Sequence, residues 1–486
     1  MEAAGEAISK MEVHDWNRDK IDREVRVPIY RQLKEIIKSK IEKGDFKPGT
    51  RIPTEYELCE IYDISRISVR QALTELANEG LLYRRPGQGT FVNHEIRKSV
   101  PSIRVMLPEN RWVPPLQEAV GLYNQDAEKV KLEVEVLGRP QLRNKILSAV
   151  GKGVAPDLAL VDWAWVTEFA DLRFLKSLDR LDSHWLEEFK ADLFPAFRTN
   201  TFYGVQPEAS VSVLWYRKDW FLQEGAQPPR TWNELIEVSR HFKRLKRFPL
   251  AFVGGTKAGE TTTYQLLPFI WAAGGDLLSE NRVALDEKAV YAVQFLVDLI
   301  HKHKVVSPEV VAFAWDKPAR LFAQGNVALA VGGSYEKALI QEVSGWDDAA
   351  FRERVGCIPI PAPSGGSSAS VVGGMVYVIF RQSKDAKSVL EILKQVASPE
   401  LMRTFCVETG RTPTRVSVVQ TLDPETNWFS YQVSQFLQSA RSRPAIPQYA
   451  KVSEQFQLMI ENALTKRMTP KKAVEEARKI INFLIS

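Results

Sequence analysis

The chain has few cysteines for its length: 486 residues include only Cys59, Cys357 and Cys406. An odd number of widely spaced cysteines argues against a disulfide framework and a thiolate metal site, and it is typical of a reducing compartment. Long apolar runs are also missing, since no stretch approaches the roughly 20 residues of a membrane-spanning helix. The first residues are polar and charged, without the apolar core of a secretory signal. These absences predict a cytoplasmic protein with no membrane partner.

Neither basic nor acidic residues are in large excess. The net charge of +5 is small for this length, so it permits a nucleic-acid partner without requiring one. The 44% of apolar and 26% of charged residues are ordinary for a soluble globular protein. Because 486 residues exceed what one hydrophobic core usually organises, two or three domains are expected.

Motifs for catalysis or for cofactors are also lacking. The segment "GGTKAGETT" (254–262) has the glycine spacing of a phosphate-binding loop, but Glu260 stands where that loop needs its lysine. The "HKH" of 301–303 lies at a charged helix end, where solvated side chains are more frequent than metal ligands. No G-x-S-x-G nucleophile motif and no lysine in a Schiff-base context are found. We therefore predict neither an enzyme nor a metal or other cofactor.

Helical periodicity is clear after the first residues. One apolar stripe indicates a helix that stops near Gly44; its members are Ile29, Leu33, Ile36, Ile37 and Ile41. Thr54 and Glu57 have capping-box spacing and open a second helix, and a third runs from Ser65 to just before Gly80. Two strand-like segments, "LLYRR" and "TFV", then flank "PGQG" as in a hairpin. Three helices and a basic hairpin predict a winged helix of the α+β class.

The third helix carries chemistry suited to DNA. Its first turns expose Ser65, Arg66, Ser68 and Arg70. An arginine can bond the O6 and N7 atoms of guanine together, and a serine hydroxyl can bond phosphate. The positive end of the helix also favours a nearby phosphate. This helix is therefore the candidate recognition helix.

The hairpin adds a second DNA-binding element. Arg84 and Arg85 can neutralise phosphates, and Gly87 and Gly89 let the backbone approach the sugar–phosphate edge closely. On spacing alone, a helical bundle with a solvated charged face explains the same residues equally well.

Longer motifs distinguish the two interpretations. The motifs KPGTRIPTE, SRISVRQAL, L-x-x-E-G-L and G-x-GTFV lie in residues 27–94, which resemble the DNA-binding domain of the GntR family of bacterial regulators. The resemblance implies a dimer on a short palindrome, with arginines at the bases and phosphates and a wing-tip glycine in the minor groove. Many relatives carry an arginine where Tyr56 stands, so Glu55 or Tyr56 would serve in its place here. The residues predicted to contact DNA, from their chemistry and from the resemblance together, are Glu55, Tyr56, Ser65, Arg66, Ser68, Arg70, Gln71, Arg84, Arg85, Gln88, Gly89 and Thr90.

Beyond a polar linker at 95–102, strand and helix patterns alternate to the end of the chain. Strands are expected at "IRVML", "KLEVEVL", "PDLALVD", "SVSVLWYR", "VALAVGG" and "GMVYVIF", with helices such as "TWNELIEVSRHFKRL" and "KKAVEEARKIINFLIS" between them. Alternation of this kind predicts an α/β domain with mainly parallel sheets, and its length favours two lobes. Residues 1–26 are weakly patterned and are expected to form a flexible tail.

From residue 103 onward, several ordered motifs resemble family 1 extracellular solute-binding proteins, the sugar receptors of bacterial importers. The motifs are "APDLALVDW", "FYGVQPEASVSVLWYRKDWF", "PRTWNELIEVSRHFK", "PFIWAAGGDLL", "AVGGSYE", "VGCIPIPAPSGGSSASVVGGMVYVI" and "ETGRTPTR". The resemblance implies a two-lobe, periplasmic-binding-protein-like fold of type II over 103–486. Lobe I would comprise about 103–211 plus 373–425, and lobe II about 212–372 plus 426–486. A ligand would bind between the lobes.

Sugar sites combine aromatic platforms with a few polar hydrogen-bonding groups. Trp163 and Trp165 follow a predicted strand end, where ligands of open α/β sheets collect, although core packing explains any single tryptophan equally well. The ligand-binding residues that the resemblance implies are Asp162, Trp163, Trp165, Glu208, Trp271, Ser334, Tyr335, Gly373, Gly374 and Arg411.

Together the two halves predict a transcriptional repressor whose operator binding is controlled by a small effector, a sugar or an oligosaccharide. The alternative keeps the DNA-binding half, but its large domain has lost ligand binding and serves protein interaction or dimerisation.

Overall fold

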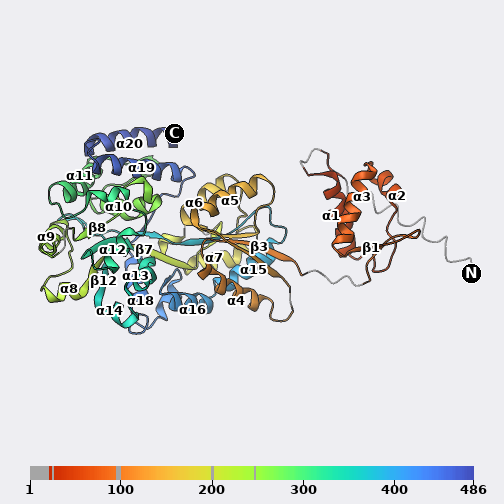
Figure 1. Ribbon diagram of the computed structural model, residues 1–486, viewed down its shortest axis with the longest axis horizontal. Coiled ribbons are helices and arrows are strands. Elements are labelled where there is room, and N and C mark those ends of the chain that lie inside the picture. The colour runs from red at the N-terminus through yellow and green to blue at the C-terminus, as the bar shows by residue number, and fades with distance from the viewer. Residues whose placement is uncertain (1–20, 24–26, 95–99, 128, 199–201, 246–247) are drawn as a thin grey trace, which may run out of the picture. The chain divides into compact units, whose positions relative to one another are not determined.

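The computed structural model describes residues 21–23, 27–94, 100–127, 129–198, 202–245 and 248–486 (Figure 1). The chain divides into two compact units, Met1–Val100 and Pro101–Ser486. The predicted tail at 1–26 and the predicted linker at 95–102 fall largely outside the described residues. Of the linker, Ser102 already belongs to the first strand of the second unit.

The N-terminal unit has the predicted three helices and hairpin. Its elements are α1 (Ile29–Glu42), α2 (Glu55–Tyr62), α3 (Arg66–Asn78), β1 (Leu82–Arg85) and β2 (Gly89–Val92). The capping box is present, because the Thr54 hydroxyl accepts from the Glu57 amide and the Glu57 carboxylate accepts from the Thr54 amide. The strands pair antiparallel, with Leu82 opposite Val92. Leu33, Ile37 and Val69 are fully buried, so helical periodicity located this core correctly.

The first sheet of the C-terminal unit has the order β4-β3-β5-β14-β6. Its strands are β3 (Ser102–Leu107), β4 (Lys131–Val136), β5 (Leu158–Asp162), β6 (Gly204–Val205) and β14 (Met375–Ile379). The helices nearest to it in sequence are α4 (Val113–Tyr123), α5 (Arg139–Gly151), α6 (Trp163–Asp171), α7 (Ser183–Ala191), α15 (Ala386–Val396), α16 (Pro399–Thr409) and α17 (Val416–Gln420).

The second sheet is built around one long strand, β7 (Glu208–Arg217). The sheet also contains β8 (Leu250–Ala251), β11 (Leu329–Gly333), β12 (Val355–Ile358), β13 (Val371–Gly373), β15 (Thr412–Pro413) and β16 (Arg441–Ser442); β9 (Leu278–Ser279) and β10 (Arg282–Val283) form a separate hairpin. The associated helices are α8 (Lys218–Gln223), α9 (Trp232–Lys243), α10 (Glu260–Ala272), α11 (Glu287–His301), α12 (Lys317–Ala323), α13 (Lys337–Ser344), α14 (Asp348–Arg354), α18 (Trp428–Leu437), α19 (Tyr449–Leu464) and α20 (Pro470–Ile485).

The prediction of mainly parallel sheets is wrong. Strand β3 runs parallel to β4 and β5, but β14 is antiparallel to β5 and β6, and β7 is antiparallel to β11, β12, β13 and β15. The reason is the path of the chain. It passes from the first sheet into the second through β6 and β7, and it returns through β13 and β14. Crossings in opposite directions make β13 antiparallel to β7 and β14 antiparallel to β6, whereas helical crossovers would give parallel neighbours.

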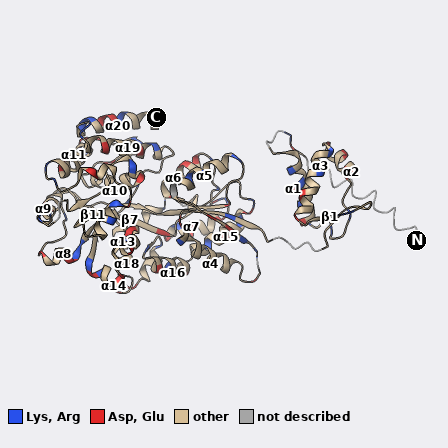
Figure 2. Cartoon of the chain, in the orientation of Figure 1, with Lys and Arg blue, Asp and Glu red and all other residues tan. Residues whose placement is uncertain are grey.

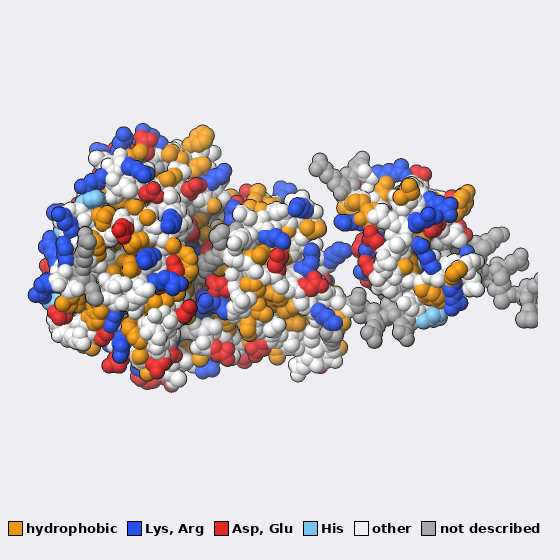
Figure 3. Space-filling model, in the orientation of Figure 1, with side chains coloured by type: hydrophobic (Ala, Val, Ile, Leu, Met, Phe, Trp, Pro, Cys, Tyr) orange, Lys and Arg blue, Asp and Glu red, His pale blue; other side chains and the backbone are white. Residues whose placement is uncertain are grey.

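Charge is evenly mixed over the molecule. Lysines and arginines alternate with aspartates and glutamates along the helices of both units (Figure 2), and apolar side chains are scattered between them on the visible face (Figure 3). A local arrangement of side chains, rather than a large field of one sign, must therefore define any binding site.

Candidate DNA-binding face and ligand cleft

Helix α3 presents the predicted polar face to solvent. Val69, Ala72, Leu73 and Leu76 are buried on its inner side. Ser65 caps the helix, since its hydroxyl accepts from the Ser68 amide at 3.3 Å. The remaining predicted contact residues of this helix, Arg66, Arg70 and Gln71, are exposed.

Glu55 of α2 holds both arginines of this face. Arg66 Nε donates to Glu55 Oε2 at 3.1 Å, and Arg70 Nη2 donates to the same oxygen at 3.3 Å. Burial alone would raise the pKa of Glu55, but the hydrogen bonds from Arg70 and Arg66 outweigh it and hold that pKa below its usual value. The neighbouring Tyr56 is exposed, and a hydrogen bond to Glu60 raises the pKa of its hydroxyl. Glu55 thus ties the two helices of the helix-turn-helix together at the arginines.

The wing is joined to this face. Arg84 Nη2 donates to the Thr74 hydroxyl of α3 at 3.2 Å, and the Arg85 guanidinium lies 5.4 Å from the ring centroids of both Tyr83 and Phe91. Gln88, exposed, and Thr90, half-buried, flank the tip of the hairpin.

At the tip, Gly89 has φ of +118°, and a Cβ atom there would lie 2.8 Å from Arg51 Nε. The positive φ favours glycine here, whereas the exposed side chain of Arg51 could move away from a Cβ atom. Arg51 is not among the residues predicted from the sequence for this site, although its positive charge within the motif KPGTRIPTE could have indicated it.

The second unit contains a small polar cavity of about 60 Å³ where several strands end. It is lined by Asp162, Glu208, Ser210, Glu260, Thr261, Tyr264, Tyr335, Gly373, Gly374, Met375, Arg411 and Arg443. Six of the predicted ligand-binding residues meet there: Asp162, Glu208, Tyr335, Gly373, Gly374 and Arg411. They come from the end of β5, the start of β7, the turn after β11, the β13–β14 junction and the loop after α16.

Glu208 and Arg411 form a buried ion pair in this cavity. Arg411 Nη1 lies 3.0 Å from Glu208 Oε2, and the two side chains are 9% and 1% exposed. The other carboxylate oxygen of Glu208 accepts from the Met375 amide at 3.0 Å. No aligned hydrogen bond from a described residue reaches Oε2, which is buried, so its pairing with Arg411 is ionic.

Arg443 joins acidic groups from a helix and from a strand. Its Nη1 donates to Glu260 at the start of α10, and its Nη2 lies 3.7 Å from Asp162 at the end of β5. Burial alone lowers the pKa of Arg443, but the negative charge of Glu260, followed by Tyr449 and Asp162, raises it above its usual value. The Nε atom of Arg443 is buried and has no hydrogen-bond partner among the described residues.

Four predicted ligand-binding residues lie outside the lining of this cavity. Trp163 is buried beneath Arg443, whose guanidinium is 5.6 Å from the tryptophan ring centroid. Trp165 packs against Phe169. Trp271 is buried, and its indole donates to Asp276 at 2.8 Å. The Ser334 hydroxyl accepts from the Val211 amide of β7 at 3.0 Å.

Sequence reasoning missed half of the lining: Ser210, Glu260, Thr261, Tyr264, Met375 and Arg443. Glu260 drew notice only because it breaks the phosphate-loop pattern. Tyr264 lies within the apolar helix α10, where burial raises the pKa of its hydroxyl well above the usual value. Arg443 had no signal, since only folding brings it beside Asp162 and Glu260.

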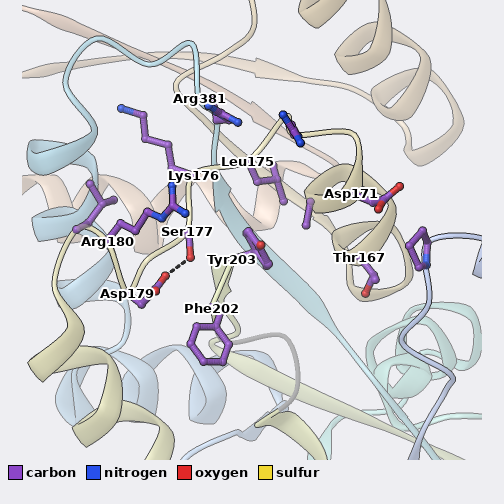
Figure 4. Close-up of a pocket in the computed structure, with 14 residues that line it drawn as sticks. Thr167, Asp171, Leu175, Lys176, Ser177, Asp179, Arg180, Phe202, Tyr203 and Arg381 are labelled. Carbon is purple, nitrogen blue, oxygen red and sulfur yellow. Dashed lines mark hydrogen bonds between the residues drawn. The ribbon is translucent and has the colours of Figure 1, made fainter. Parts of the chain in front are cut away.

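A second cavity of about 1160 Å³ opens beside α6 (Figure 4). Its charged lining residues are Asp171, Arg173, Lys176, Asp179, Arg180 and Arg381. In Figure 4, Lys176, Arg180 and Arg381 lie on the same side of the view, away from Asp171. Ser177 donates to Asp179 at the rim. None of the predicted ligand-binding residues belongs to this lining.

Within the described part of the chain, no helix is both long and apolar enough to cross a membrane. The same residues include no group of three or more histidine, cysteine or acidic side chains placed to hold a metal ion. In the "HKH" segment, His301 bonds the Leu464 carbonyl at 2.8 Å, and His303 bonds Arg240 at 2.8 Å.

Solved structures share the fold of the second unit. A solute-binding protein of Thermotoga lettingae bound with alpha-D-tagatose matches with a TM-score of 0.68 and 24% identity, over 79% of this chain and 100% of that one. The maltose-bound protein MalE3 of T. maritima matches with a TM-score of 0.67 and 25% identity, over 79% of this chain and 99% of that one.

A sequence relative extends the comparison. The HTH-type transcriptional repressor NagR of Bacillus subtilis (strain 168) is 48% identical over 218 residues, which cover 42% of this chain and 89% of the relative. A putative binding protein of Brucella abortus (strain 2308) is 22% identical over 349 residues, covering 70% of this chain and 82% of the relative.

Family models account for both units. Residues 29–92 match the bacterial regulatory proteins of the gntR family, and residues 109–403 match the bacterial extracellular solute-binding proteins. The predicted winged helix and the predicted two-part binding-protein fold are thereby confirmed. The chain belongs to the bacterial extracellular solute-binding protein family, and it carries a GntR-type helix-turn-helix domain ahead of that fold.

Proposed function

We propose that this protein is a sugar-responsive repressor, which binds operator DNA through the first unit and a small polyhydroxylated effector in the cavity of the second. One observation carries the proposal: carboxylates, guanidinium groups and hydroxyls from distant segments converge on a single small cavity. A sugar hydroxyl both donates and accepts hydrogen bonds, so it is matched by the carboxylates of the lining, such as Glu208, as acceptors and by the guanidinium groups, such as Arg443, as donors.

The size of the cavity refines the ligand class. A volume of about 60 Å³ leaves room for only a few water-sized groups. Even a monosaccharide exceeds this volume, so the small size favours a monosaccharide or a similar polyol over a long oligosaccharide only once the unit has opened. Its entry requires that the two parts of the unit separate and then close around it.

Known relatives support both the DNA-binding part and the sugar-binding part of the proposal. NagR is named a repressor, and an arabinose metabolism transcriptional repressor of Geobacillus stearothermophilus is 49% identical over 71 residues, which are 20% of that protein. The solved structures that share the fold include complexes with tagatose, maltose and ribitol.

The proposal includes a homodimer on a palindromic operator, because two equal DNA-binding units read two equal half-sites. It places the protein in the cytoplasm, where the operator is, and it assigns binding rather than catalysis. Sugar binding would change the spacing of the two DNA-binding units and release the operator.

The test begins with the purified full chain and a panel of neutral monosaccharides and polyols. We expect at least one to raise the melting temperature. Arg411→Lys should reduce this shift strongly, because lysine cannot reproduce the guanidinium geometry beside Glu208. Arg403→Lys, an exposed site on α16, should leave the shift unchanged.

The second step uses an operator selected from random duplexes, with fluorescence anisotropy as the readout. The stabilising sugar should lower operator affinity. Binding of the operator without a response to any sugar would overturn the effector assignment, and it would favour an interaction or dimerisation role for the second unit.

A further inference from the structure

The recognition helix exposes one large apolar side chain. Ile67 of α3 is 80% exposed, whereas the inner residues Val69, Leu73 and Leu76 are at most 1% exposed. At about 100° per residue, position 67 lies almost directly opposite this buried stripe. Ile67 therefore stands at the centre of the outward face.

Polar residues surround Ile67 on that face. Arg70 and Gln71 lie three and four residues further on, so they are its neighbours on the helix surface. Arg66 and Arg70 are drawn toward α2 by Glu55. The side chains of Arg66 and Arg70 are thus held toward α2, and the apolar Ile67 occupies the middle of the outward face of α3.

Folding gives no reason for an isoleucine here. The side chain stays in water, and a β-branched residue favours a helix less than alanine, lysine or arginine would. An isoleucine at this position gains little from packing within the chain, whereas it would gain by burying its apolar surface against a bound partner.

On the basis of the DNA-binding function proposed above, we propose that Ile67 contacts the 5-methyl group of a thymine. The methyl group of thymine is the apolar group that base pairs present in the major groove, and side chains with methyl groups are its usual partners. Each operator half-site would then carry a thymine at a fixed step from the base pair read by Arg66 or Arg70. Ile67 is thus a specificity-determining residue.

The expected effect is small but measurable. Burying one methyl-sized group contributes about 0.8 kcal/mol, which is about a fourfold change in affinity. Replacing the relevant thymine by uracil deletes only this methyl group and keeps the Watson–Crick pairing.

The experiment uses the full chain and an operator selected from random DNA duplexes. Each thymine of the selected operator is replaced in turn by uracil, and affinities are measured for the wild type, Ile67→Ala and Ile480→Ala. Ile480 is an exposed isoleucine of α20 and serves as the matched control. Ile67→Ala should fold normally, since its side chain packs on nothing, and circular dichroism checks this.

We expect one position per half-site at which uracil lowers affinity about three- to fivefold for the wild type and for Ile480→Ala. For Ile67→Ala, thymine and uracil should bind equally at that position. Insensitivity of the wild type to every uracil would overturn the assignment, and so would an unchanged thymine preference in Ile67→Ala. If selection enriched no sequence at all, the DNA-binding proposal itself would fail.

Discussion

Glu55 organises the face of α3 that is predicted to contact DNA, because one carboxylate holds both Arg66 and Arg70. Its position in the predicted contact set suggested a direct contact with the operator. Its observed hydrogen bonds favour a positioning role instead: the arginines are held ready rather than left mobile. Holding them in advance reduces the side-chain entropy lost when DNA binds.

Replacing Glu55 with glutamine should separate these roles. Glu55→Gln removes a negative charge, which raises affinity for random DNA, but it also weakens the hold on both arginines. The ratio of operator affinity to random-DNA affinity should fall about three- to tenfold, measured by anisotropy at fixed salt. Glu42→Gln, an exposed change on α1, serves as the control and should leave the ratio unchanged. An unchanged ratio in Glu55→Gln would contradict the positioning role.

Glu336 predicts a pH dependence of stability. Burial raises its pKa to about 8, while hydrogen bonds from Gly333 and Trp215 oppose this shift. A raised folded-state pKa stabilises the fold fully below the ordinary value near 4.5, and this contribution disappears as pH rises through about 8. The melting temperature should therefore decrease between pH 5 and pH 9.

Glu336→Gln tests whether Glu336 causes this pH dependence, since glutamine keeps an acceptor for Trp215 but cannot ionise. Its melting temperature should vary less over the same pH range. The exposed Glu408→Gln should retain the wild-type slope. A slope in Glu336→Gln equal to that of the wild type would assign the pH dependence to other groups.

At the scale of elements, local patterns predicted helices better than sheets. The stripe of α1, the capping box of α2 and the inner face of α3 are encoded by residues a few positions apart. Strand direction is not local: β7 is antiparallel to β13 because the chain crosses between the sheets and returns, and no short sequence pattern reports that path. Prediction of the cavity had the same limit. Its predicted residues were found through motifs that resemble a known family, whereas nothing in the sequence distinguished Tyr264 and Arg443 from ordinary helix and loop residues.

The β13–β14 junction is the element most sensitive to substitution in the cavity. Gly374 has φ of +144°, and a Cβ atom there would lie 2.6 Å from the Glu208 carbonyl oxygen. Gly374→Ala should lower the free energy of unfolding by about 1–3 kcal/mol, measured by denaturant unfolding. Gly345→Ala has a positive φ but open space around it, so it should cost less. Equal costs would mean that the backbone conformation, and not the close contact, sets the requirement for glycine.

At the scale of the whole molecule, the proposed function requires coupling between two separate compact units. Such coupling must be reciprocal: if a sugar lowers operator affinity by some factor, the operator lowers sugar affinity by the same factor. We expect titration calorimetry of the stabilising sugar, with and without saturating operator, to give this equality. A sugar that binds equally well in both conditions while still releasing DNA would contradict a two-state mechanism.

In the proposed function, the ionic groups of the cavity would also determine which chemical modifications of a sugar the protein can tolerate. Three carboxylates, Asp162, Glu208 and Glu260, face two guanidinium groups, Arg411 and Arg443. An acidic or phosphorylated sugar would add negative charge where carboxylates already exceed guanidinium groups, whereas an amine would reduce the excess. Cells often attach phosphate to a sugar as they take it up or begin to break it down. A repressor with this cavity would respond to the unmodified sugar but not to its phosphorylated form. Expression of the gene that it represses would then follow the supply of the sugar rather than its consumption.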